Sequence, residues 1–300
     1  MKTLRAIVAG TDFSPVAETA LRSAAHLARR YNAALHLLAV VVPPAVYRRA
    51  LAAVVPAPAT AQLVAAATER LQQLCGAPFL AGCKVVANVR VGVPFAELIA
   101  AGREYEASLI VVGARPHRGV EHLMLGHTTE RVMRKAPVPV LIARSELNPE
   151  PTCVLAPIDF SDAARCAAEE AIALARRWIA KLIFLHVIEP IVQTYLWPLD
   201  SGAVEIFPAE PADLKGEWED FLGDLDLHDL RWERRTLKGD AAALIEQTAR
   251  EEAADLIVLG THGNTGLAHA LLGSLVERVV RTTARPVLTI RPEAFQFTLP

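Results

Sequence analysis

The chain has 300 residues, which is too long for one ordinary domain and fits two. Hydrophobic residues make up 52% of the chain, and the formal net charge is −2 at pH 7. These values exclude a disordered chain, and they exclude a strongly basic surface for nucleic acid or acidic membranes.

The first half alternates short apolar runs with amphipathic segments, which predicts strands that alternate with helices. Asp12 or Ser14 is expected to cap the first of these helices. The expected strands are Leu4–Ala9, Leu35–Val42, Lys84–Val91, Leu109–Val112 and Val138–Ala143, and the expected helices are Pro15–Tyr31, Gln62–Gln73, Phe95–Glu104 and Glu121–Arg134.

The second half repeats the first at an offset of 147 residues, so that Ala9–Ser14 matches Ala156–Ser161. Between Val111–Arg144 and Val258–Arg291, 14 of 34 positions are identical. We therefore predict two copies of one domain, residues 1–147 and 151–293, joined by a short linker around Glu146–Pro151. The expected elements of the second copy are the strands Val154–Ile158, Leu182–Ile188, Leu230–Leu237, Leu256–Leu259 and Val287–Ile290, and the helices Ala163–Trp178, Ala241–Glu252 and Leu275–Val280.

The segments that differ most between the copies, Tyr47–Thr60 and Tyr195–Lys215, are expected to be surface excursions, with flaps over the binding sites as the alternative. No uninterrupted apolar run reaches ~18 residues, and the start of the chain does not resemble a secretory signal. The four cysteines form no C-x-x-C pair, which favours ordinary thiols. We expect a cytoplasmic protein with neither nucleic-acid nor membrane partners.

Strands that alternate with helices predict an α/β fold with a parallel sheet covered on both faces. Ligands of such sheets bind at the carboxyl ends of the strands. In the second copy Asp159 follows the first strand, and Gly260 ends the fourth. We expect both residues to lie at one edge of the sheet.

After the fourth strand of the second copy, three glycines are spaced Gly260, Gly263 and Gly273, and Ser274 follows. Glycines let the backbone expose its N–H groups, and a helix N-terminus attracts phosphate. The motif is neither a Walker loop nor a dinucleotide fingerprint. A glycine-rich connection that binds nothing, with Asp159 or Ser161 as a helix cap, is the alternative interpretation.

The strand-end aspartate, the repeated 147-residue unit and the spaced glycines resemble the universal stress protein family over nearly the whole chain. The resemblance implies two tandem Rossmann-like domains, similar to the adenine nucleotide alpha hydrolases. Each has a five-stranded parallel sheet flanked by helices, and one branch of the family binds ATP. It also implies that the last strands of the two halves pair antiparallel, as an intramolecular pseudo-dimer. Whether two chains then form a homodimer stays open.

The resemblance also assigns an ATP site in the second domain, with Mg²⁺ as an option. Asp159 is expected near adenine or ribose, and the backbone of Val187 is expected to contact adenine. The residues expected to hold ribose and phosphates are Gly260, Gly263, Gly273, Ser274 and the N–H of Leu275. We predict no catalytic residue and no metal ligand.

The first copy departs from this motif, because Pro116 stands where Gly263 is expected and His127 replaces Ser274. Proline offers no N–H to a phosphate. We therefore expect the first domain to bind ATP weakly or not at all. His117, His122 and His127 are interpreted as polar surface histidines rather than as a metal site.

Three functions remain open on the sequence. The protein is expected to be an ATP-binding stress-response and signalling module. The alternatives are a slow ATPase or nucleotidyl-transfer enzyme, and an interaction protein that binds no nucleotide.

Overall fold

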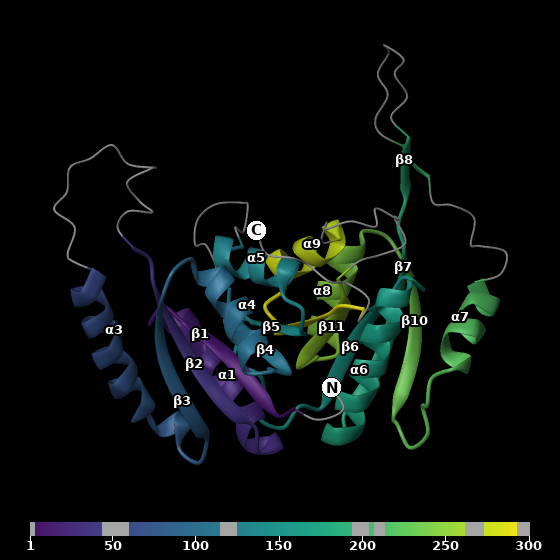
Figure 1. Cartoon of the computed structure of the whole chain (residues 1–300). Coiled ribbons are helices and arrows are strands. Elements are labelled where there is room, and N and C mark those ends of the chain that lie inside the picture. The colour runs from purple at the N-terminus through teal and green to yellow at the C-terminus, as the bar shows by residue number, and fades with distance from the viewer. Residues whose placement is uncertain are drawn as a thin grey trace, which may run out of the picture. The chain divides into compact units, whose positions relative to one another are not determined.

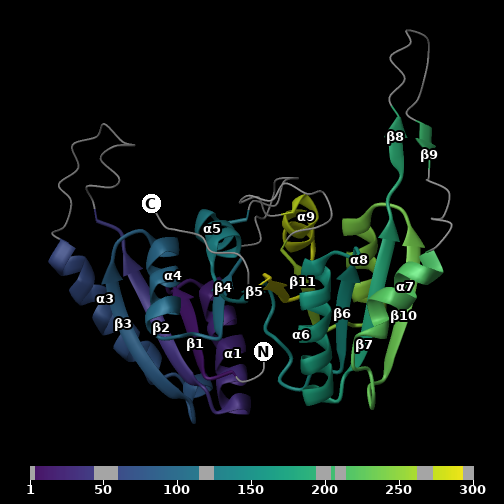
Figure 2. The same cartoon turned by 45° about the vertical axis from the view of Figure 1, so that its right-hand side comes forward.

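The computed structural model describes residues 4–43, 60–114, 125–193, 204–206, 214–261 and 273–292. The chain divides into two compact units, and each is considered by itself. The first unit contains Met1–Pro149 together with Ala284–Pro300, and the second contains Glu150–Thr283. Figures 1 and 2 label most of the elements of both units.

The described part of the first unit contains a sheet in the order β3-β2-β1-β4-β5-β12, parallel from β3 to β5. Its elements are β1 (Ala6–Thr11), α1 (Pro15–Tyr31), β2 (Ala34–Val41), α3 (Thr60–Cys75), the 3-10 turn η1 (Pro78–Leu80), β3 (Lys84–Val91), α4 (Pro94–Glu104), β4 (Leu109–Gly113), α5 (His127–Lys135), β5 (Val140–Ala143) and β12 (Val287–Ile290).

The central strands β1 and β4 are buried at nearly every position. A strand with buried side chains on both faces needs helices on both faces of its sheet. The helix α1 supplies one of these contacts, because it packs on β1 and β4 through an alanine-rich buried stripe. The helices α4 and α5 pack against each other.

The strand β12 comes from the end of the second sequence repeat, yet it belongs to the first unit. It pairs antiparallel with β5, with Val287 opposite Ile142, Leu288 opposite Leu141 and Thr289 opposite Val140. This confirms the expected antiparallel pairing of the two last strands. The domain boundaries 1–147 and 151–293 stay a prediction.

The described part of the second unit contains four parallel strands in the order β10-β7-β6-β11. Its elements are β6 (Cys153–Ile158), α6 (Asp162–Trp178), β7 (Lys181–Ile188), β8 (Ile191–Gln193), β9 (Val204–Ile206), α7 (Leu214–Gly223), β10 (Trp232–Lys238), α8 (Ala241–Glu251), β11 (Leu256–Gly260) and α9 (Ser274–Thr282). The α/β fold class is confirmed.

Three local features differ from the sequence prediction. The helix expected over Glu121–Arg134 begins at His127, because Gly126 adopts an extended N-cap conformation. The helix α7 was not predicted, and neither was the antiparallel pair β8–β9, of which β9 lies in the expected excursion Tyr195–Lys215. The other excursion lies outside the described residues except for Thr60, where α3 begins.

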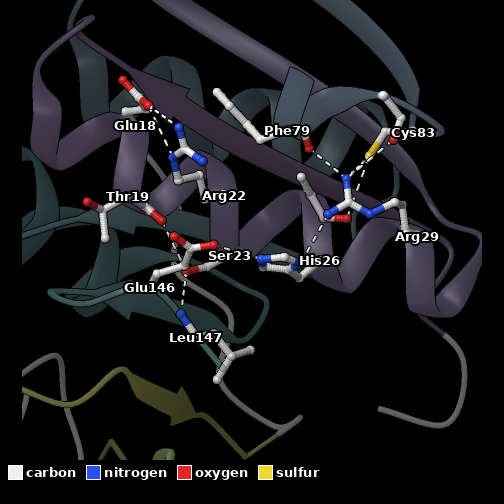
Figure 3. Close-up of polar contacts among 12 residues, drawn as sticks. Glu18, Thr19, Arg22, Ser23, His26, Arg29, Phe79, Cys83, Glu146 and Leu147 are labelled. Carbon is white, nitrogen blue, oxygen red and sulfur yellow. Dashed lines mark hydrogen bonds and ion pairs between the residues drawn. The ribbon is translucent and has the colours of Figure 1, made fainter. Parts of the chain in front are cut away.

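The first residues of the predicted linker form hydrogen bonds with side chains of α1 (Figure 3). The Leu147 N–H donates to Ser23 Oγ at 2.9 Å, and Leu147 is buried. His26 Nε2 lies 2.7 Å from Glu146 Oε1. Arg29 extends the same network, since its guanidinium contacts His26 and donates to Phe79 O. The first part of the linker is therefore part of the folded unit.

Candidate functional site

The carboxyl end of β6 is the switch point of the second unit, because β7 lies on one side of it and β11 on the other. Asp159 follows β6, Val187 is the second-to-last residue of β7, and Gly260 ends β11. The structure thus brings three of the predicted site residues to adjacent strand ends, where α/β sheets bind ligands.

Asp159 is held in a tight turn before α6. Its Oδ1 accepts from the Ser161 N–H at 3.1 Å and from the Ser161 hydroxyl at 2.5 Å. Phe160 between them has a left-handed φ of 60°. Ser161 caps α6, because its Oγ accepts from the Ala164 N–H at 3.1 Å. The helix cap is therefore Ser161, and Asp159 stabilises the turn between β6 and α6 through its hydrogen bonds to Ser161.

Aromatic side chains pack around Phe160 in the same turn. The Phe160 ring lies 4.6 Å from the His186 ring, 5.2 Å from Trp218 and 5.7 Å from Phe221, measured between centroids. His186 Nδ1 lies 2.8 Å from Ile158 O. Sequence reasoning missed this cluster, because two of its rings come from the unpredicted helix α7.

Gly260 has a packing role of its own. A Cβ at this position would lie 2.6 Å from the carbonyl oxygen of Ala163, which is backbone that has no room to move. Gly113 occupies the matching position of the first unit, where a Cβ would lie 2.7 Å from Val16 O. The close approach of strand and helix therefore explains both glycines without any ligand.

Gly273 is different, because the described residues leave space around it. Their nearest heavy atom to an added Cβ is Thr261 O at 3.6 Å. Its φ of −59° and ψ of 135° are open to any residue. Neither packing against the described residues nor backbone strain accounts for glycine here. A ligand that approaches the peptide closely would account for it.

The helix α9 starts at Ser274, directly after Gly273. Gly273 gives the helix no side-chain cap, and its N–H donates to Thr261 O at 3.0 Å, which holds the helix start against the end of β11. The first N–H groups of a helix, here those of Ser274 and Leu275, have no acceptor within the helix. Such N–H groups attract an anion that approaches the helix end. Gly263 lies outside the described residues.

A charged cluster joins α9 to the neighbouring strand end. Arg278, one turn after Ser274, is paired with Asp240 and lies 3.7 Å from Glu189 Oε1. Glu189 accepts from the Ala241 N–H at 3.2 Å. Burial works against ionisation of Asp240, but bonds from the Ala243 N–H and Arg278 hold the pKa of Asp240 below its usual value. Sequence reasoning did not single out these residues.

The first unit has a cavity of about 550 Å³ at the matching place. The residues around it include Asp12, Leu38, Val40, Leu98, Gly113 and His127. At the offset of 147, Asp12 corresponds to Asp159, Val40 to Val187 and His127 to Ser274. Pro116, His117 and His122 lie outside the described residues.

Within the described ranges, no helix is both long and apolar enough to cross a membrane. The same residues bring together no group of three His, Cys, Asp or Glu side chains that could hold a metal ion.

These elements define an α/β protein built from two copies of a parallel-sheet domain. The sequence model of the universal stress protein family matches residues 3–144 and 152–291. The chain therefore belongs to the universal stress protein family, as a tandem-domain member.

Comparison with individual proteins agrees with this assignment. A universal stress protein of Mycolicibacterium smegmatis is 28% identical over 195 residues, which cover 62% of this chain and 62% of that protein. One of Mycobacterium bovis is 27% identical over 313 aligned residues, which cover 95% of this chain and 94% of that protein. The crystal structure of a universal stress protein from Archaeoglobus fulgidus has the same fold, with a TM-score of 0.69, 19% identity, and coverage of 95% of this chain and 98% of that one.

Proposed function

We propose that the second domain binds ATP and that the protein acts as a nucleotide-dependent stress-response and signalling module. Asp159 accepts from adenine or ribose, and the backbone of Val187 contacts adenine. The residues that hold ribose and phosphates are Gly260, Gly263, Gly273, Ser274 and Leu275. ATP then stabilises one conformation of the protein and alters its contacts with partners. Its cytoplasmic location stays a prediction.

The space beside Gly273 carries this proposal. It lies against the N-terminus of α9, whose N–H groups and positive dipole end attract phosphate. Asp159 stands at the adjoining strand end, and its position is fixed by Ser161 and by the packing of Phe160. The proposed site thus has N–H donors for an anion at the α9 end and a hydrogen-bond acceptor, Asp159, at the β6 end.

Titration calorimetry of the full chain with ATP, with and without Mg²⁺, tests the proposal. We expect one ATP per chain. Gly273→Ala should weaken binding at least about tenfold, because a methyl group would displace the phosphate from the N–H groups. The described surroundings of Gly273 leave room for that methyl, so the variant is expected to fold.

Gly126→Ala is the matched control, because Gly126 occupies the same position in the first repeat and the described residues leave space around it. It should leave ATP binding unchanged. Unchanged affinity in Gly273→Ala would contradict the proposed site, and two equivalent ATP sites per chain would contradict the expected difference between the domains. ATP turnover in the same samples separates a binding module from a slow ATPase.

A further inference from the structure

We propose that a basic surface of the first unit, formed by Arg22, Arg70 and Lys84, binds the acidic α7 segment of a second copy of this chain. The contact joins two chains, and it does not depend on ATP binding in the second domain. Opposite charges on matching segments of the two repeats carry the proposal.

The two units carry opposite charges, although the chain as a whole is nearly neutral. The first unit has 19 Lys and Arg residues against 10 Asp and Glu residues, a formal charge of +9. The second unit has 12 Lys and Arg residues against 23 Asp and Glu residues, a formal charge of −11. Electrostatic complementarity therefore favours an encounter in which the first unit of one chain meets the second unit of another.

The acidic charge of the second unit is concentrated in and directly after α7, which lies beside β10 (Figure 1). The helix turns Trp218 toward the sheet, where the indole N–H donates to Thr236 Oγ1 at 3.1 Å. Residues 214–231 hold six acids against two basic residues. All six acids are exposed, and they are Glu217, Glu219, Asp220, Asp224, Asp226 and Asp229.

Basic side chains of the same unit balance only part of this charge. Lys215 lies 3.6 Å from Glu219, and α6 supplies Arg165, 3.7 Å from Asp224, and Arg176, 3.1 Å from Asp226. Within the described ranges, no basic side chain is paired with the other three acids. Clustered like charges repel each other, so a basic surface that covers this segment is stabilised by it.

The matching segment of the first repeat, residues 67–84, has the same packing without the acidic charge. Leu71 corresponds to Trp218 at the offset of 147, and both side chains are buried. This segment has one acid, Glu69, and two basic residues, Arg70 and Lys84, and Arg70 stands where the second repeat has Glu217. Because one kind of packing accommodates both charges, the fold does not require either of them.

The arginines of the basic surface are held on aromatic rings. Arg70 Cζ lies 4.5 Å from the centroid of the Phe13 ring, and Arg22 Cζ lies 4.5 Å from that of Phe79 (Figure 3). A guanidinium stacked on a ring keeps N–H groups at its edge for a carboxylate. Lys84 is exposed at the start of β3. This surface is therefore suited to carboxylates such as those of the α7 segment.

The charge difference also holds for the sequence that precedes each segment. Residues 44–59 contain two arginines and no acid, whereas residues 194–213 contain four acids and no basic residue. The sign of the charge on each side therefore does not depend on which residues the structure describes.

Sedimentation velocity of the full chain at pH 7, over a range of protein concentrations, tests the proposal. We expect self-association at about 50 mM NaCl and at least about tenfold weaker association at about 500 mM, because salt screens exposed charges. The double variants Arg70→Glu/Lys84→Glu and Glu217→Lys/Asp220→Lys should each weaken association at least about tenfold at low salt. All four side chains are exposed, so both variants are expected to fold, which thermal unfolding verifies.

An equimolar mixture of the two double variants gives the sharpest test. The reversed surface of one variant then meets the reversed segment of the other, so the mixture should associate although neither variant does so alone. The matched control is Arg103→Glu/Arg131→Glu, which changes the net charge equally at exposed positions of α4 and α5 and should leave association nearly unchanged.

Three results would overturn the proposal. The first is a wild-type chain that stays monomeric at low salt. The second is a mixture of the double variants that does not associate. The third is a control variant that associates as weakly as Arg70→Glu/Lys84→Glu, because association would then depend on net charge and not on this surface.

Discussion

Ile179 follows α6 in a left-handed conformation, with φ 58° and ψ 35°, and it is 94% exposed. A β-branched residue is strained in this region, whereas asparagine adopts it readily. The matching residue of the first repeat is Asn32, with φ 54° and ψ 33° and the same kind of helix-end bonds to the preceding turn. The two repeats thus place different residues in one backbone geometry.

Ile179→Asn is expected to stabilise the second unit by about 1 kcal/mol, because it relieves the backbone strain and removes no buried contact. The free energy of unfolding in urea measures the effect. Asn32→Ile is the reciprocal control and should destabilise the first unit by a similar amount. A variant Ile179→Asn no more stable than the wild type would show that this position carries no strain.

At the scale of elements, β2 packs on α4 through a histidine. The His36 ring stacks on Tyr105 at 4.0 Å between centroids and 11° between planes. Burial lowers the pKa of His36, and the nearby Glu104 carboxylate opposes this shift without cancelling it. The folded protein therefore favours the neutral imidazole, whereas the unfolded chain binds a proton at the ordinary value of about 6.5.

This pKa shift makes stability depend on pH. Because the unfolded state binds the proton more readily, stability contributed by His36 is present above about pH 6.5 and is lost as the pH falls through the folded pKa. His36→Ile introduces the residue that the second repeat has at the matching position, Ile183. This variant should show a smaller change of the unfolding midpoint between about pH 7 and pH 5 than the wild type. Identical pH profiles for the two proteins would contradict this assignment.

The repeated elements were predictable because each carries its own hydrophobic pattern. The helix α7 was not, since it buries Trp218 and Phe221 among acidic and exposed residues and its local pattern is weak. The start of α5 was placed too early because apolar residues continue the helical pattern before Gly126, and the extended conformation of Gly126 ends that pattern.

Part of the candidate site was predictable, because the strand pattern places Asp159 and Gly260 at strand ends and the glycine spacing places Gly273 at a helix start. The packing explanation of Gly260 was not, because the contact with Ala163 joins residues about a hundred positions apart. The same limit applies to Arg278, which meets Asp240 and Glu189 only after the chain has folded. The cavity of the first unit is lined by side chains from several elements, and no sequence motif predicts it.

At the scale of the whole molecule, the first unit depends on residues near the C-terminus. Leu288 in β12 is buried opposite Leu141 in β5. Leu288→Ala should destabilise the first unit by about 2–5 kcal/mol, because it leaves a cavity in a packed core. Hydrogen exchange measured by mass spectrometry should then become faster in β4 and β5 and stay unchanged in β6 and β7.

Leu182→Ala, in the buried strand β7, is the control for the other unit and should accelerate exchange there instead. Faster exchange of β6 and β7 in Leu288→Ala, with β5 unaffected, would show that β12 supports the second unit rather than the first.

The origin of β12 also bears on how the protein tolerates cleavage. Proteolysis between Pro149 and Thr152, followed by loss of the C-terminal fragment, would remove β12 and leave β5 as an unpaired edge strand of four apolar residues. An unpaired edge strand of this kind pairs readily with a strand from another molecule. Isolated N-terminal halves are therefore expected to associate through β5 or to precipitate, although nearly all of their own sequence is intact.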